Sequence, residues 1–183
     1  MTEYIDLVNS KDEVIGKALR SEVHQKGLLH RHVNVFFVTP QKEVIFQHRA
    51  QDKDTYPGLL DSTVGGHVDL GLTYTEAALQ EMNEETGVAA RAEELVFLKK
   101  IGVHATDSDT SMTNNIFACT YAYIFRGQLS DLHIEEGKAV GFEAFNIDDL
   151  QNLHDEERQK FIPNLVNDEY LELYREMKQL ALQ

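Results

Sequence analysis

The segment GGHVDLGLTYTEAALQEMNEETGV, residues 65–88, constrains the fold more than any other part of the chain. Thr73 and Glu76 have the spacing of a capping box, in which a hydroxyl and a carboxylate each bond an unpaired backbone N–H at the start of a helix. Gly87 fits a helix end, because glycine readily adopts a positive φ. We therefore predict a helix over residues 74–86, preceded by a glycine-containing loop.

Three glutamates lie close together near the end of this helix: Glu81, Glu84 and Glu85. Their i, i+3, i+4 spacing places them on one side, where like charges repel each other. The helix dipole also disfavours anions at a C-terminal end. Violations of local rules tend to mark functional sites, and oxygen ligands suit a hard cation such as Mg²⁺, with Mn²⁺ as an alternative. A solvated acidic helix face is the other interpretation of the same spacing.

The glycine pair strengthens the metal hypothesis. Gly65 and Gly66 have no Cβ, so their backbone can approach a metal or a phosphate closely. A cation held by the three glutamates and the Gly66 backbone would polarise a phosphoryl group and orient an attacking water. We therefore predict Gly66 as a further metal contact and the glutamates as catalytic residues.

The rest of the chain predicts a mixed set of strands and helices. Two short strands around a turn at residues 9–12 precede a short helix that starts at a capping Ser21 and ends at Gly27. Next come a hairpin over 33–49 and an irregular stretch over 51–71. We then predict strands over 95–103, 115–127 and 139–147, with a polar loop over 105–114 between the first two, and a short helix over 148–153. The chain continues into an amphipathic helix over about 167–182, and we expect one side of it in the core: Leu171, Tyr174, Met177 and Ala181. This order predicts α+β, or an α/β sandwich in which helices cover a mixed sheet.

Composition excludes several function classes. The 183 residues fit one domain, and the net charge of −14, without clustered Lys and Arg, argues against nucleic acid as the partner. No apolar run approaches the ~20 residues that cross a bilayer, and the acidic start is unlike a secretory signal. The single cysteine, Cys119, suits a reducing compartment, so we expect a cytoplasmic protein that does not bind membranes.

Residues 66–88 resemble the Nudix box of the Nudix superfamily. Seven of its nine specified positions agree: Gly66, Glu81, Met82, Glu84, Glu85, Gly87 and Val88. Leu72 replaces the first glutamate and Gln80 replaces the arginine, two positions that brace the loop and helix in the family. The resemblance implies one Nudix-type α/β/α sandwich with a mixed sheet over residues 1–183. It also implies divalent-metal-dependent hydrolysis of a small-molecule diphosphate linked to another moiety.

Residues 3–150 also look like the branch that includes type 1 isopentenyl-diphosphate isomerases. In the isomerases an essential cysteine precedes the Gly-His of the loop, whereas this chain has Gly65 there. Asn114 and Asn115 stand where the isomerases use a Glu-x-Glu pair. These differences favour a hydrolase over an isomerase. A binding module without catalysis is a third alternative, because Leu72 and Gln80 weaken the box.

The resemblance and the charges suggest further site residues. His24, His30 and His67 fall near the positions where the isomerases hold a second metal, and His67, directly after Gly66, is the best candidate to face the site. Arg49 and Lys53 flank the loop and could bind substrate phosphate. Glu135 or Glu136 could serve as a general base. The sequence leaves the substrate and the oligomeric state open, with a homodimer as one alternative.

Overall fold

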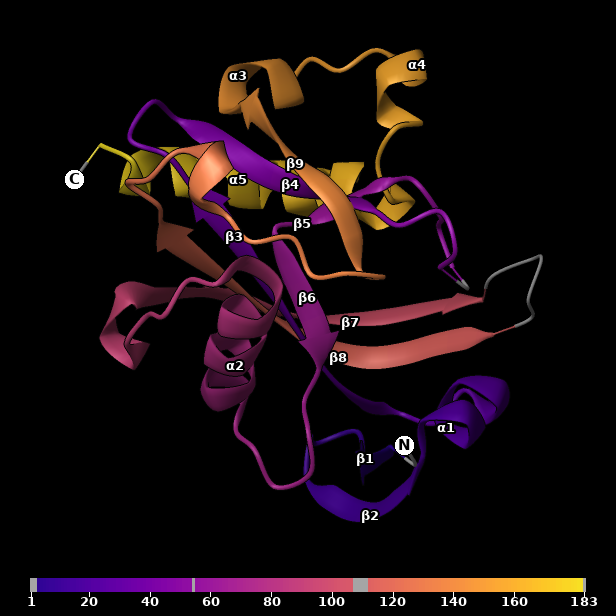
Figure 1. Ribbon diagram of the computed structural model, residues 1–183. Coiled ribbons are helices and arrows are strands. Elements are labelled where there is room, and N and C mark those ends of the chain that lie inside the picture. The colour runs from indigo at the N-terminus through magenta and orange to yellow at the C-terminus, as the bar shows by residue number, and fades with distance from the viewer. Residues whose placement is uncertain (1–2, 54, 107–111, 183) are drawn as a thin grey trace.

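The computed structural model describes residues 3–53, 55–106 and 112–182. A curled mixed sheet has helix α2 (Tyr74–Thr86) on one face and helix α5 (Asp168–Leu180) on the other (Figure 1). This arrangement confirms the predicted α/β/α sandwich. No helix in the described part of the chain is long and apolar enough to cross a membrane.

The sheet is built from nine strands among the described residues. These are β1 (Tyr4–Val8), β2 (Val14–Leu19), β3 (His30–Val38), β4 (Glu43–Arg49), β5 (Leu60–Ser62), β6 (Val64–His67), β7 (Leu95–Thr106), β8 (Thr113–Ile124) and β9 (Ala139–Asn146). The other helices are α1 (Arg20–Lys26), α3 (Ile147–Leu150) and α4 (Asp155–Arg158), with 3₁₀ turns at Ala92–Glu94, Leu129–Asp131 and Pro163–Val166.

Strand β3 is the centre of the sheet. It runs parallel to β8 along its whole length and antiparallel to β6, where Asn34 lies opposite Gly65. Its ends make shorter antiparallel pairings with β1 and β4. Because both faces of β3 are covered, its sequence is a continuous apolar run from Val35 to Val38 rather than an alternating one.

Each face of the sheet has its own apolar cluster. Phe36 and Phe46 pack with Tyr174 of α5, whereas Val35 and Phe37 belong to the cluster beneath α2 that includes Met82. The predicted core side of the C-terminal helix is confirmed, since three of its four residues are buried and the fourth packs against the cluster: Leu171, Tyr174, Met177 and Ala181. The two clusters fix α2 and α5 on opposite sides of β3.

Two predictions of local structure were wrong. Helix α1 begins at Arg20, with Leu19 at the N-cap, so Ser21 lies inside the first turn and caps nothing; Gly27 ends the helix with φ 60°, as predicted. The stretch over 51–71 is not irregular throughout, because it contains β5 and β6. Strand β6 is short and half glycine, so its pairing with β3, rather than its own composition, makes it a strand.

The polar loop predicted over 105–114 is shorter than expected. Strand β7 continues to Thr106 and β8 already begins at Thr113, with the two side-chain hydroxyls 3.0 Å apart. The intervening residues 107–111 lie outside the described part of the chain.

Candidate functional site

Helix α2 and strand β6 meet at the glycine pair. The capping box is present: Thr73 Oγ1 accepts from Glu76 N at 3.3 Å, and Thr73 N donates to Glu76 Oε2 at 2.8 Å. Gly87 ends the helix at φ 71°. Gly66 lies against the carboxylate of Glu81, and a Cβ at Gly66 would overlap that carboxylate. Glycine at position 66 therefore leaves the space that the Glu81 carboxylate occupies.

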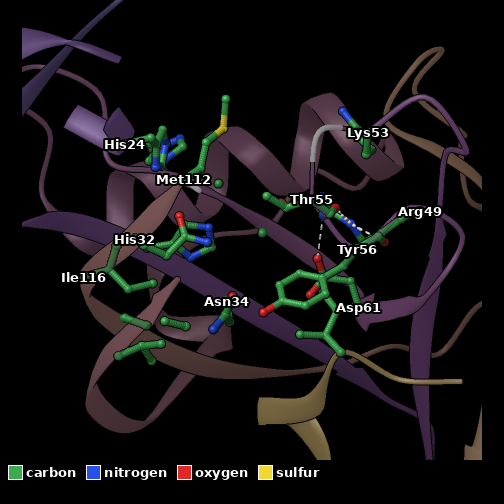
Figure 2. A pocket seen from close by; sticks show the side chains of 18 of the residues that line it. His24, His32, Asn34, Arg49, Lys53, Thr55, Tyr56, Asp61, Met112 and Ile116 are labelled. Atoms are coloured by element: carbon green, nitrogen blue, oxygen red, sulfur yellow. Dashed lines mark hydrogen bonds and ion pairs between the residues drawn. The ribbon is translucent and has the colours of Figure 1, made fainter. Parts of the chain in front are cut away.

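A pocket of about 780 Å³ opens beside this junction (Figure 2). Its wall includes Gly65, Gly66 and His67 of β6 with Glu81 of α2, and its floor comes from β3, β7 and β8. Tyr170 of α5 also lines the pocket, and its hydroxyl accepts a hydrogen bond from Asn34 Nδ2 at 3.0 Å. The volume is in the range of pockets that bind small molecules.

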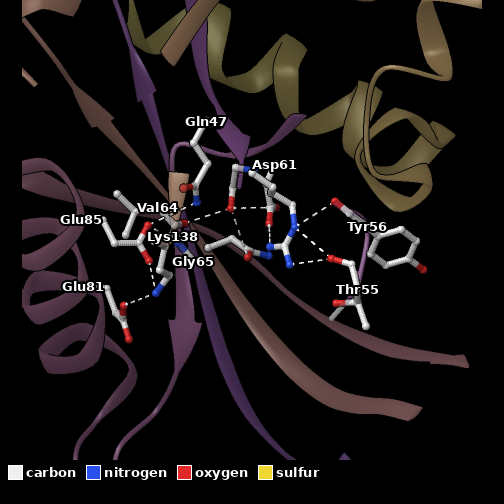
Figure 3. Close-up of polar contacts among 12 residues, drawn as sticks. Gln47, Thr55, Tyr56, Asp61, Val64, Gly65, Glu81, Glu85 and Lys138 are labelled. Carbon is white, nitrogen blue, oxygen red and sulfur yellow. Dashed lines mark hydrogen bonds and ion pairs between the residues drawn. The ribbon is translucent and has the colours of Figure 1, made fainter. Parts of the chain in front are cut away.

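Glu85 lies beside Gln47, Gly65 and Lys138 (Figure 3). It is the most buried carboxylate of the site, since 2% of its side chain is exposed. Its Oε2 accepts from Gly65 N and from Gln47 Nε2, each at 3.3 Å. Its Oε1 lies 2.5 Å from Lys138 Nζ. Burial raises the pKa of Glu85 to about 8, although the Lys138 ammonium opposes this shift.

Glu81 joins Glu85 around the same ammonium. Glu81 Oε2 lies 3.2 Å from Lys138 Nζ, and burial raises the pKa of Glu81 as well. Glu84 is exposed, and within the described residues no ion pair or side-chain hydrogen bond ties it to the other two. The structure thus brings together two of the three predicted glutamates and leaves the third at the solvent side of α2.

The two departures from the Nudix box have different environments. Gln80 Nε2 donates to Asp69 Oδ2 at 3.1 Å, so the helix remains tied to the loop that precedes it. Leu72 packs against the apolar cluster beneath α2. A hydrogen bond from an uncharged amide to a carboxylate and an apolar contact therefore join loop and helix here.

Arg49 lines the pocket, but its guanidinium is already engaged. Nη1 lies 2.9 Å from Asp61 Oδ2, Nη2 donates to Thr55 O at 2.8 Å, and Nε lies 3.2 Å from the carbonyls of Thr55 and Tyr56. Arg49 therefore anchors the pocket loop that carries Thr55 and Tyr56. Lys53, at the wall of the same pocket, has a pKa lowered by burial and by the nearby cations Lys138 and Arg49.

Three histidines from three elements converge beside β6. The candidate ligand atoms of His24 (α1), His30 (β3) and His67 (β6) all lie within 4.8 Å of one another, and the Nε2 atoms of His24 and His67 are 3.1 Å apart. His30 Nδ1 must donate to the Leu28 carbonyl at 2.8 Å, so its Nε2 carries the lone pair in the neutral ring. That buried Nε2 has no hydrogen-bond partner among the described residues. The cluster therefore offers nitrogen ligands.

Burial keeps these rings neutral. It lowers the pKa of His30 to about 4 and that of the neighbouring His32 to about 3, and it holds the pKa of His67 well below its usual value. The pKa of His24 is lowered for the same reason. Neutral imidazole is the form that binds metals.

Two pocket residues carry no motif that marks them in the sequence. The ring of His32 contacts that of His67, and the two ring centroids are 5.6 Å apart. Lys138 reaches the glutamates because the turn before β9 places it there, whereas the predicted general bases Glu135 and Glu136 do not line the pocket. A lysine after an acidic turn is too common a pattern to identify such a residue.

The asparagines that replace the isomerase Glu-x-Glu pair have separate environments. Asn114 lines the pocket, and Asn115 Nδ2 donates to the Gly27 carbonyl at 3.0 Å. Asn115 therefore connects β8 to the end of α1.

Comparison with known proteins identifies relatives of this chain. The family model described as NUDIX domain matches residues 28–165. Nudix hydrolase 3 of Arabidopsis thaliana is 29% identical over 97% of the chain, which spans only 23% of that protein. An uncharacterized Nudix hydrolase of Clostridium acetobutylicum is 28% identical over 84% of the chain and 74% of its own length. The crystal structure of DR0079 from Deinococcus radiodurans has a TM-score of 0.66 and 26% identity, over 96% of this chain and 99% of that one.

Proposed function

This chain belongs to the Nudix family, and from that membership we propose that it is a divalent-metal-dependent hydrolase of a diphosphate linked to another moiety. The observation that carries the proposal is the pair of half-buried Glu81 and buried Glu85, which meets the glycine pair of β6 at the wall of a pocket. A solvated acidic helix face would not bury a carboxylate to 2% exposure or tie it to the Gly65 backbone.

The site suits a hard cation. The side-chain donors are carboxylate oxygens, and Glu81 and Glu85 already share one positive charge. Mg²⁺ or Mn²⁺ prefers this donor set, and the residues that would hold it are Glu81, Glu85, the Gly66 backbone and, from the solvent side, Glu84. Such an ion would neutralise charge that develops on phosphoryl oxygens during hydrolysis.

The protein's own groups supply the remaining chemistry. Water attacks phosphorus and the bond to the leaving phosphoryl oxygen breaks, so the attacking water must lose a proton. Glu81, the carboxylate of the pair that lines the pocket, is placed to accept that proton. Arg20 and Lys53 line the pocket and favour an anionic substrate.

A second metal position is proposed at the histidines. The candidate ligand nitrogens of His24, His30 and His67 lie within 4.8 Å of one another, and this donor set suits Zn²⁺ or Mn²⁺ better than Mg²⁺. Exchange of His67 for Asn should lower the number of Zn²⁺ ions bound per chain by one in equilibrium dialysis. An unchanged stoichiometry would exclude the histidines as ligands.

Neither alternative function has comparable support. An isomerase needs acid–base groups where this chain has Gly65, Asn114 and Asn115, and Asn115 is already bonded to Gly27. A binding module without catalysis predicts ligand binding and no phosphate release at any Mg²⁺ or Mn²⁺ concentration.

A substrate screen tests the hydrolase proposal. Nucleoside and sugar diphosphates are incubated with the protein and Mg²⁺ or Mn²⁺, and released phosphate products are measured beside the Glu85→Gln variant. We expect turnover of at least one substrate, abolished by Glu85→Gln in a protein that keeps its fold by circular dichroism. Equal turnover in the variant would show that the site is placed wrongly.

A further inference from the structure

Lys138 Nζ lies where a cation would bind between the two glutamates. It is 2.5 Å from Glu85 Oε1 and 3.2 Å from Glu81 Oε2, and 27% of the Lys138 side chain is exposed (Figure 3). Lys138 lies in the turn before β9, whereas both glutamates lie on α2. The ammonium therefore neutralises part of a negative charge that α2 alone would leave uncompensated.

The backbone of Lys138 is fixed by hydrogen bonds, whereas the ion pairs with the two glutamates are what hold its side chain in this rotamer. Lys138 N donates to Glu135 O at 3.1 Å, and Lys138 O accepts from Ala50 N at 3.1 Å. Its side chain has a flexible four-carbon stem and lines the pocket that also contains Lys53. A change of rotamer can therefore carry the ammonium from the glutamates into the pocket without a change in fold.

A divalent ion and this ammonium exclude each other. A metal about 2.1 Å from carboxylate oxygens would occupy the space that Nζ fills, and two cations at contact distance repel strongly in a buried site. Metal entry thus requires the Lys138–Glu85 ion pair to break. Breaking a buried pair is costly unless another cation replaces the one that leaves.

We propose that Lys138 is an internal cation that occupies the metal position of Glu81 and Glu85 and moves into the pocket when a divalent metal binds. In the pocket its ammonium meets the phosphates of an anionic substrate, so metal entry and substrate binding are coupled. The inference rests on the proposed function only in placing the metal at these two glutamates. It assigns Lys138 a positioning role in the metal-free and metal-bound forms.

Direct metal binding tests the exclusion. Mn²⁺ binding is measured by titration calorimetry, and Lys138→Met, of similar length and without charge, should bind Mn²⁺ at least about tenfold more tightly than the unaltered protein. Lys53→Met is the matched control, because it removes a pocket cation that contacts neither Glu81 nor Glu85; we expect a change below about threefold. Equal or weaker binding by Lys138→Met, or an equal gain in the control, would overturn the proposal.

Amine labelling of the unaltered protein tests the movement and does not depend on any variant folding. A lysine-reactive reagent is applied with and without saturating Mn²⁺, and modified peptides are quantified by mass spectrometry. Labelling of Lys138 should rise severalfold with Mn²⁺, while that of the exposed Lys160 stays constant. Unchanged or reduced labelling of Lys138 would contradict its release.

The outcomes separate this inference from the hydrolase proposal. If Mn²⁺ binding and labelling change as expected but no diphosphate is cleaved, the hydrolase proposal fails and this inference stands. If Mn²⁺ does not bind, the inference fails.

Discussion

Gly66 and Glu81 lie so close together that any side chain at position 66 would overlap the carboxylate. Strand β6 is held by its pairing with β3, and α2 is held by Ala78 and Met82 in the core, so neither element can retreat easily. The missing Cβ is therefore part of the geometry of the proposed metal site.

Gly66→Ala should displace the Glu81 carboxylate and weaken Mn²⁺ binding. A shift near 1 Å in a catalytic group can cost about 10²-fold, so we expect kcat/KM to fall by that order. Gly141→Ala is the control, since a Cβ at Gly141 of β9 meets nothing within 4 Å. Mn²⁺ titration and steady-state kinetics of both variants provide the measurement, and equal behaviour of the two would contradict the close-approach argument.

The three glutamates should differ in importance. Glu81→Gln and Glu85→Gln remove the two charges that contact the cation position, and we expect kcat to fall by about 10²-fold or more. Glu84→Gln changes an exposed side chain and should cost clearly less. Steady-state kinetics at saturating Mg²⁺ measure all three. If kcat fell most in Glu84→Gln, the assignment of Glu81 and Glu85 as the main metal ligands would be wrong.

The sequence predicted the elements whose signals are local. The capping box at Thr73, the stop at Gly87 and the apolar side of α5 all depend on residues a few positions apart, so their patterns survive without tertiary context. The same holds for the hairpin of β3 and β4, which follows from β-branched and aromatic runs.

Features that depend on distant pairing were not predictable. Strand β6 is identified by its register with β3, where Gly66 lies opposite Val33. Lys138 reaches the glutamates only because β9 pairs with β4, which no local pattern reveals. The resemblance suggested each of the three histidines as a site residue, but their convergence requires α1, β3 and β6 to meet at one place.

Asp12 joins the first hairpin to the rest of the fold. Its carboxylate lies 2.7 Å from Arg31 Nε and 2.9 Å from Lys100 Nζ, and accepts from Tyr74 Oη at 3.0 Å. Asp12→Asn tolerates the positive φ of 63° but removes the charge, so it should lower the free energy of unfolding by about 1–3 kcal/mol. Urea denaturation measures this, with the exposed Asp52→Asn as control; a loss equal to that of the control would argue against the network.

The buried histidines should make the metal-free protein sensitive to acid. The pKa of His30 is about 4 in the folded protein and near 6.5 when unfolded, so between these values the unfolded chain binds more protons. The contribution of neutral His30 to the free energy of unfolding is therefore complete above pH 6.5, and it is lost as the pH falls toward 4. The loss amounts to about 3 kcal/mol for this one group.

Urea denaturation at several pH values, with a chelator present, checks this expectation. His30→Gln should show a weaker fall in the free energy of unfolding from pH 6.5 to 4.5 than the unaltered protein. Glu85, whose pKa is raised, acts in the opposite direction but is present in both proteins and cancels in the comparison. The exposed His104→Gln is the control. Parallel pH profiles for His30→Gln and the unaltered protein would refute the assignment.

Arg49 should act on substrate through the loop rather than through its charge. Its guanidinium holds the carbonyls of Thr55 and Tyr56 and the carboxylate of Asp61 at once, and Tyr56 has an unusual positive φ of 50° that such contacts must maintain. Arg49→Lys keeps the charge but cannot reproduce this planar set of donors. We therefore expect faster amide exchange at Tyr56 and a KM raised by about tenfold, with kcat changed less.

A direct phosphate contact by Arg49 predicts a different result. Lysine would retain much of that contact, so KM would rise less and amide exchange in the loop would stay as it was. Hydrogen-exchange mass spectrometry and steady-state kinetics on the same protein separate the two possibilities. Arg91→Lys is the control, because it makes the same exchange of arginine for lysine at a side chain that is 72% exposed. Because only loss of the loop anchor changes both exchange and KM, a KM effect without an exchange effect would assign Arg49 to the substrate.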